Sequence, residues 1–177
     1  LASFRQAGAG ADAGAARLGQ AACLLATGAW QEAHDLLVQV ADQEPLLRHR
    51  AATGLALLFT RVGQFDTALG YVDRALEAAP RDPYALYLRG RSLRLMGQSA
   101  AAEEAISATL RERDDFVHAI AEMSATQRAI ATGTLDTEQV TALVAARRYA
   151  DRAVQLAPRP VLELYEAQGL CAFAAAD

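Results

Sequence analysis

The feature that most constrains this chain is a repeat of about 34 residues. The sequence spaces three glycines 35 and 34 residues apart: Gly28, Gly63 and Gly97. An alanine follows each glycine by five residues, and in the first two segments a proline follows that alanine by twelve. These positions are Ala33, Ala68 and Ala102, with Pro45 and Pro80. A period of this length is typical of stacked helix pairs, so the chain is expected to be a repeat protein.

The glycines and prolines predict where helices end. Glycine adopts the left-handed backbone that ends many helices, and proline stops a helix because it lacks the N–H donor. The expected helices cover 13–27, 30–43, 48–62, 65–79, 83–96, 99–112, 116–132, 137–157 and 160–175. Residues 1–12 are interpreted as a frayed end or the tail of an earlier helix. No segment alternates apolar and polar residues as a strand does.

Small residues recur where the two helices of one repeat would meet. They are Ala21, Ala56 and Gly90 in the first helices, and Ala33, Ala68 and Ala102 in the second. Small side chains allow a close approach, and larger ones such as Leu37, Val72 and Ile106 would fill the space beside it. Enlarging Ala68 or Gly90 is expected to cost about 1–3 kcal/mol through overpacking.

This register resembles the tetratricopeptide repeat (TPR) family. The resemblance implies an all-α fold, a right-handed α-solenoid of stacked antiparallel helix pairs, with 1–177 forming a single array. The expected repeats are 13–47, 48–82, 83–116 and 117–160, followed by a partial repeat at 161–177. The fourth repeat closes about ten residues late, which places an insertion near 132–141 and predicts a long second helix with a protruding loop. The partial last repeat leads us to expect a longer polypeptide.

The resemblance also implies a concave groove lined by the first helix of each repeat. Matching positions in this sequence include Arg50, Arg61, Tyr84, Tyr87, Arg91, Arg94, His118 and Arg128, with Glu122 among them. Arginine forms bidentate hydrogen bonds with carboxylates and stacks on aromatic rings, so the expected partner is a protein or peptide of acidic character. The alternative is that the arginines only lay their stems over apolar surface with their heads in water.

One subtype of the family is disfavoured by four residues. TPR domains that grip the acidic C-termini of heat-shock chaperones use lysine and asparagine as a clamp. The corresponding positions here hold Leu18, Ala22, Gly54 and Tyr84. The clamp is therefore absent, and an adaptor for chaperone tails is not expected.

Composition removes several enzyme classes. All 17 basic residues are arginine, and the chain contains neither lysine nor asparagine. A phosphate-binding lysine, a Schiff-base lysine and an N-glycosylation site are thereby excluded. The same bias suggests a GC-rich, bacterial source. No catalytic, metal-binding or cofactor motif is found, so the chain is expected not to be an enzyme.

Few histidine arrangements could carry chemistry. His34 and Asp35 are neighbours on a helix and are expected to point apart. Asp115 and His118 have a spacing that could orient an imidazole, although a helix cap beside a solvated histidine is favoured. Cys23 and Cys171 are expected to be buried, reduced thiols.

The net charge of −4 argues against nucleic acid as the partner, and no apolar run is long enough to span a membrane. The cytoplasm is the default location. Two further roles stay open beside partner binding: a regulatory or substrate-recruiting arm of a larger enzyme such as a transferase, and a self-assembling scaffold that forms homo-oligomers through its apolar C-terminal helix.

Overall fold

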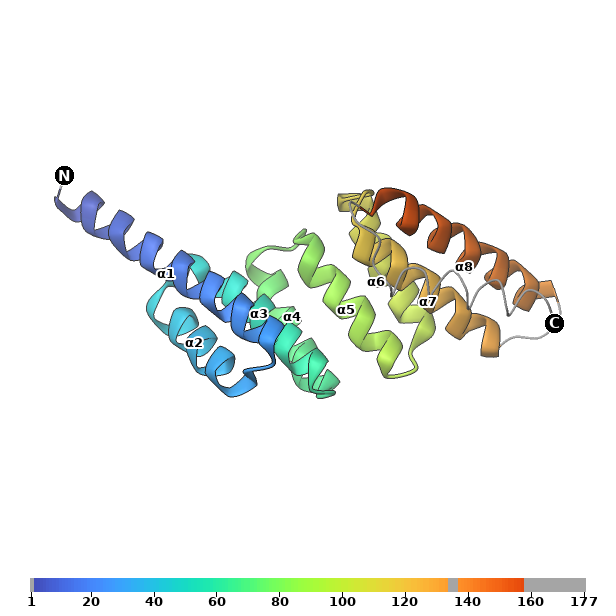
Figure 1. The fold of residues 1–177 in the computed structure, drawn as a ribbon, viewed down its shortest axis with the longest axis horizontal. Coiled ribbons are helices and arrows are strands. Elements are labelled where there is room, and N and C mark those ends of the chain that lie inside the picture. The colour runs from blue at the N-terminus through green and yellow to red at the C-terminus, as the bar shows by residue number, and fades with distance from the viewer. Residues whose placement is uncertain (1, 134–136, 158–177) are drawn as a thin grey trace. The chain divides into compact units, whose positions relative to one another are not determined.

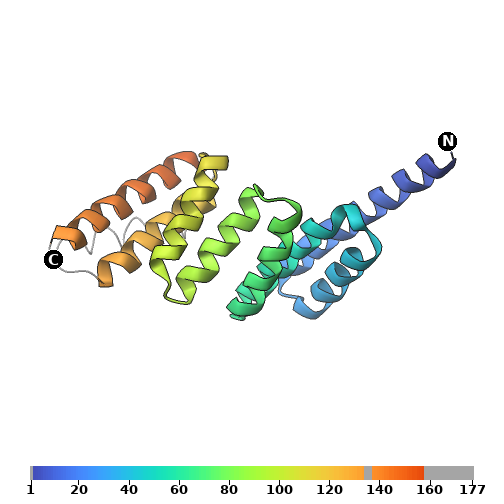
Figure 2. The same ribbon diagram turned by 180° about the vertical axis from the view of Figure 1, so that it is seen from behind.

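The computed structural model describes residues 2–133 and 137–157, with side chains described from residue 13 onward. Their backbone is helical and contains no strand. The elements are α1 (Ala2–Thr27), α2 (Trp30–Gln43), the 3-10 turn η1 (Pro45–Leu47), α3 (Arg48–Arg61), α4 (Phe65–Ala78), α5 (Pro83–Leu95), α6 (Ser99–Glu112), α7 (Val117–Gly133) and α8 (Thr137–Leu156). Short connections join each of the helices α1 to α6 to the helix that follows it, as Figures 1 and 2 show.

The chain divides into two compact units, 1–88 and 89–177, and the division falls inside α5. Unit 1 contains α1 to α4 and the first turns of α5. In it, α1 packs on α2, α2 on α3, and α3 on α4. Unit 2 contains the rest of α5 and α6 to α8, with α7 packed on both α6 and α8.

Three helices end in the same way, at the glycines that define the repeat. Gly28, Gly63 and Gly97 have φ values of 81°, 80° and 80°. The residue after each glycine donates a backbone hydrogen bond to the carbonyl five residues earlier, as in Ala29 to Leu24 at 3.0 Å and Gln64 to Phe59 at 2.9 Å. This bond satisfies a carbonyl that the helix end would leave unpaired. The sequence prediction for these three turns is confirmed.

Prolines occupy the predicted boundaries. The helix α2 ends at Gln43, two residues before Pro45, and α4 ends at Ala78, two residues before Pro80. Pro83 is the first residue of α5, where its missing N–H costs no hydrogen bond. Pro158 and Pro160 lie outside the described residues.

The core of unit 1 forms where small residues bring helices together. Ala21, Ala33, Ala56 and Ala68 have no exposed surface. Larger side chains fill the space beside them, including Leu25, Leu37 and Val40. A smaller cluster of Ala52, Ala75 and Ala85 packs α3, α4 and the start of α5 together.

In unit 2, small residues also allow the helices to approach closely. A β-carbon added to Gly90 would collide with the side chain of Ile106, so α5 and α6 approach more closely than any larger residue would permit. The buried face of α8 is a row of alanines: Ala142, Ala146, Ala150 and Ala153. The hydroxyl of buried Ser124 on α7 donates a 2.8 Å hydrogen bond to the carbonyl of Ala146.

The structure differs from the sequence prediction at two places. The helix α1 begins at Ala2 rather than at residue 13, because the alanine-rich segment continues the helix without a break. A 3-10 turn, Pro45–Leu47, was not foreseen. The predicted long helix at 137–157 is confirmed as α8, which has 20 residues against 14 in α6, and residues 134–136 of the predicted loop lie outside the described residues. The predicted helix at 160–175 lies outside the described residues.

Candidate partner-binding groove

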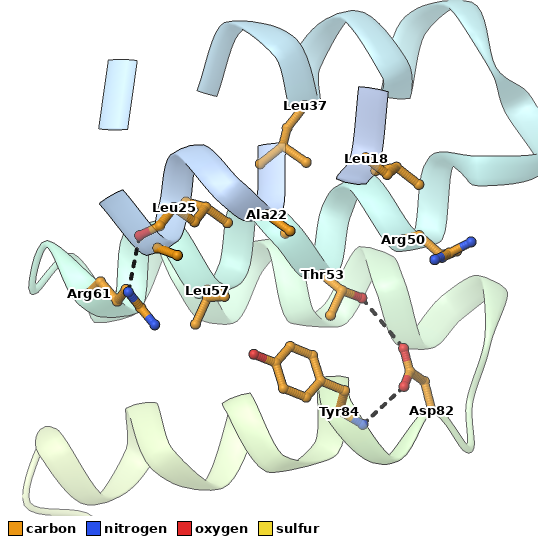
Figure 3. Close-up of a pocket in the computed structure, with 12 residues that line it drawn as sticks. Leu18, Ala22, Leu25, Leu37, Arg50, Thr53, Leu57, Arg61, Asp82 and Tyr84 are labelled. Atoms are coloured by element: carbon orange, nitrogen blue, oxygen red, sulfur yellow. Dashed lines mark hydrogen bonds between the residues drawn. The ribbon is translucent and has the colours of Figure 1, made fainter. Parts of the chain in front are cut away.

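A cavity of about 400 Å³ opens in unit 1 between α1, α3 and the start of α5. The apolar part of its wall comes from Leu18, Ala22, Leu25, Ala26, Leu37, Leu57 and Tyr84. Arg50 and Arg61 lie at opposite ends of this wall, and Tyr84 projects between them (Figure 3). Its volume lies in the range of pockets that hold small ligands or side chains of a partner.

The geometry of α3 explains why both arginines face the cavity. Arg50, Gly54, Leu57 and Arg61 are spaced by four, three and four residues, so they share one face of the helix. Gly54 carries no side chain, and a β-carbon there would lie 2.7 Å from Leu37 Cδ2. Leu37 of α2 therefore reaches the gap between α1 and α3 and forms part of the cavity floor.

Asp82 fixes the third wall. Its carboxylate accepts a 2.9 Å hydrogen bond from the backbone N–H of Tyr84. It also accepts a 3.5 Å hydrogen bond from the hydroxyl of Thr53, which shares its proton with the carbonyl of His49 at 3.0 Å. The first of these bonds caps the N-terminus of α5, and the second ties that helix to α3 (Figure 3). The ring of Tyr84 is thus held over the cavity by a fixed backbone.

The two arginines of the cavity differ in their contacts. One guanidinium nitrogen of Arg61 donates a 3.1 Å hydrogen bond to the carbonyl of Leu25, in the last turn of α1. A cation at the C-terminus of a helix is favoured by the helix dipole. Within the described part of the chain, Arg50 makes no hydrogen bond or ion pair, and no carboxylate forms an ion pair with Arg61.

The two predicted arginines of unit 2 have a different environment. Glu122 of α7 is only 6% exposed at its side chain, and it lies between Arg91 and Arg94 of α5. Arg94 Nε donates to one carboxylate oxygen, and Arg91 lies 3.5 Å from the other. The charges of these two predicted groove arginines are therefore partly neutralised by an acid from another helix. This carboxylate stood at a predicted groove position, but its burial between two arginines could not be seen in the sequence.

The other predicted groove residues lie in varied settings. Tyr87 is 4% exposed, and its ring centroid lies 5.7 Å from that of Tyr84. His118 is exposed beside Phe116, with ring centroids 5.8 Å apart. Arg128 is half-buried on α7. Three of the eight predicted residues line the same cavity, namely Arg50, Arg61 and Tyr84.

The four positions of the chaperone-tail clamp also line this cavity. They are Leu18, Ala22, Gly54 and Tyr84. The sequence analysis did not single out Asp82 and Thr53, which hold the wall in place. Asp82 precedes a proline that begins a helix, and this cap pattern was the signal available.

Two predictions made outside the groove were wrong. His34 and Asp35 do not point apart, because His34 Nδ1 lies 3.2 Å from an Asp35 carboxylate oxygen. Both side chains can bend along the helix surface, which overcomes their divergent Cβ directions. Cys23 is exposed rather than buried, and Cys171 lies outside the described residues. Asp115, proposed beside His118, pairs with Arg113 at 3.1 Å.

The described residues contain neither a metal-ligand cluster nor a membrane-spanning helix. In residues 2–133 and 137–157, no group of three or more His, Cys, Asp or Glu side chains is arranged to hold a metal ion. None of the helices described has the length and hydrophobicity needed to cross a lipid bilayer.

The fold defines a class: an all-helical protein built from TPR-like helix pairs. Comparison with solved structures agrees. The chain is similar to a tetratricopeptide repeat protein from Parabacteroides merdae ATCC 43184, with 15% identity and a TM-score of 0.53 over 93% of this chain and 74% of the other. It is also similar to a protein from Bacteroides ovatus ATCC 8483 to which protein binding is ascribed, with 14% identity and a TM-score of 0.55 over 92% and 98% of the two chains.

These likenesses show the fold. No family model matches the sequence, and no curated protein matches it.

Proposed function

We propose that this chain is a protein-interaction module that receives a peptide or partner segment in the groove of unit 1. The observation that supports this most is the cavity of about 400 Å³ between α1, α3 and α5. Its walls combine apolar side chains with arginines that make no ion pair within the described residues. Such a surface suits a partner that offers an apolar side chain and acidic groups.

The fold supports the same role. A similar solved structure carries a protein-binding description, and another is a tetratricopeptide repeat protein. The predicted C-terminal dimerisation helix lies outside those residues, so the scaffold role stays a prediction.

The test is capture of partners from extract of the source organism by the immobilised chain, compared with two leucine variants. Leu57→Glu places a charge in the apolar wall of the cavity. Leu46→Glu makes the same change at a side chain that is 83% exposed and lies outside the cavity. The proposal predicts that Leu57→Glu loses the captured proteins and Leu46→Glu keeps them. Equal capture by both variants, with helical circular dichroism unchanged, contradicts it.

A further inference from the structure

We infer that the groove selects an internal segment with two acidic side chains about five residues apart and an apolar side chain between them. The inference rests on the proposed function and names its ligand class. It comes from the order of residues on the cavity face of α3. A cation is followed by a glycine without a side chain, then by an apolar residue and a second cation: Arg50, Gly54, Leu57 and Arg61.

The spacing of the acids follows from helix geometry. Arg50 and Arg61 are eleven residues apart on one helix. At a rise of 1.5 Å per residue, their backbones are separated by about 16 Å along the axis. An extended peptide advances about 3.3 Å per residue, so about five residues cover this length. A peptide with adjacent acids satisfies only one arginine at a time.

The centre of the cavity favours an apolar side chain. Leu18 and Ala22 face it from α1, Leu57 from α3, and the Tyr84 ring from α5 (Figure 3). Among the described residues, the one carboxylate lining this cavity belongs to Asp82, which already accepts two hydrogen bonds. A carboxylate placed at the centre would therefore meet apolar walls and one negative charge. The cost of such a burial disfavours a central acid.

The same centre argues against a free C-terminus as the ligand. The positions that grip a terminal carboxylate in the chaperone-tail clamp are here two aliphatic residues, a glycine and a tyrosine. None of them supplies a cation or an amide. The cations lie at the two ends instead, where side chains of an internal segment would meet them.

The experiment titrates the full chain into fluorescein-labelled peptides of one composition, containing two glutamates, one leucine and otherwise alanine and serine. In the first peptide the glutamates are five residues apart with leucine between them; in the second they are adjacent. Each is made with a free and with an amidated C-terminus. We expect the spaced peptide to bind about tenfold more tightly, a difference of about 1.4 kcal/mol, irrespective of C-terminal amidation.

Variants assign the acids to their arginines. The double variant Arg50→Glu, Arg61→Glu is expected to lose the preference for the spaced peptide. The matched control is Arg111→Glu with Arg148→Glu, two exposed arginines outside this cavity, which makes the same change in net charge. The control is expected to keep the preference. If the double variant is poorly folded, the single variant Arg50→Glu is used, because Arg50 has no hydrogen bond or ion pair to lose within the described residues. A peptide in which lysines replace the two spaced glutamates should bind the double variant Arg50→Glu, Arg61→Glu more tightly than it binds the original chain.

The outcomes separate the inference from the proposed function. Equal binding of spaced and adjacent glutamates, or binding that requires a free C-terminus, overturns the inference. The proposed function then still stands if Leu57→Glu abolishes partner capture. If capture survives Leu57→Glu, the proposed function fails regardless of the peptide result.

Discussion

The arginines of the two units lie on corresponding first helices but differ in what surrounds them. In unit 1, Arg50 and Arg61 border an apolar cavity, and no ion pair involves them within the described residues. In unit 2, Arg91 and Arg94 share the buried carboxylate of Glu122. The repeat pattern gave all four arginines the same expected role.

The difference shows that a position on the groove face does not by itself make an arginine a ligand contact. A carboxylate within reach from another helix converts the arginine into part of the protein's own packing. A buried carboxylate left without a partner is costly, so Glu122 is expected to hold its arginines firmly. Substitutions made separately in unit 1 and in unit 2 test this difference.

The largest expected effect is from Glu122→Ala. It removes the acid that both arginines share, and we expect unfolding free energy to fall by about 2–3 kcal/mol. The value lies below that of a fully buried pair because the side chain of Arg91 is 43% exposed and can be solvated. Urea unfolding followed by circular dichroism measures the change.

The control for this variant is Glu104→Ala, at an exposed position on α6. It should shift the free energy by less than about 0.5 kcal/mol. A loss no larger for Glu122→Ala than for Glu104→Ala would show that the buried acid does not hold unit 2 together.

A smaller effect is expected from alanine at two helical glycines. Gly90→Ala brings a β-carbon into Ile106 and should destabilise by about 1–2 kcal/mol. Gly70→Ala meets no atom within 4 Å and should stabilise by about 0.5–1 kcal/mol, because alanine is the better helix former. The two midpoints of thermal unfolding should therefore move in opposite directions. Parallel shifts would mean that α5 and α6 do not approach closely at Gly90.

The smallest effects concern the cavity arginines. Arg61→Ala loses the hydrogen bond to the Leu25 carbonyl at the end of α1 and should cost about 1 kcal/mol. Arg50→Ala loses no such bond and should stay within about 0.5 kcal/mol of the original chain. Chemical denaturation of the two variants side by side checks this order. A larger loss for Arg50→Ala would assign Arg50 a structural role.

The sequence was sufficient for the helix pairs because their boundaries depend on local chemistry. Gly63 and Pro83 act through their own backbone conformations, and both lie where the pattern placed them. The start of α1 was missed because alanine and glycine leave the helix end undefined without a cap. The 3-10 turn at Pro45–Leu47 was missed because a proline can begin as well as end a helical turn.

The candidate site was predictable only in part. The resemblance to TPR repeats implied groove positions for Arg50 and Arg61, and both residues line one cavity in the structure. Ion pairs between helices depend on distances that no sequence spacing fixes, so Glu122 could not be assigned to Arg91 and Arg94. The 3.2 Å approach of His34 to Asp35 was missed for a related reason, since side-chain rotation is not encoded in helical position.

The central claim is that the cavity of unit 1, rather than the arginine pair of unit 2, is where this chain meets its ligand. The most direct test is amide chemical-shift mapping with the spaced-glutamate peptide added to the labelled chain. The account predicts the largest shifts at the cavity residues Ala22, Leu57 and Tyr84, with little change at Glu122. Shifts centred on Arg91, Arg94 and Glu122, with the unit 1 cavity unchanged, would contradict it.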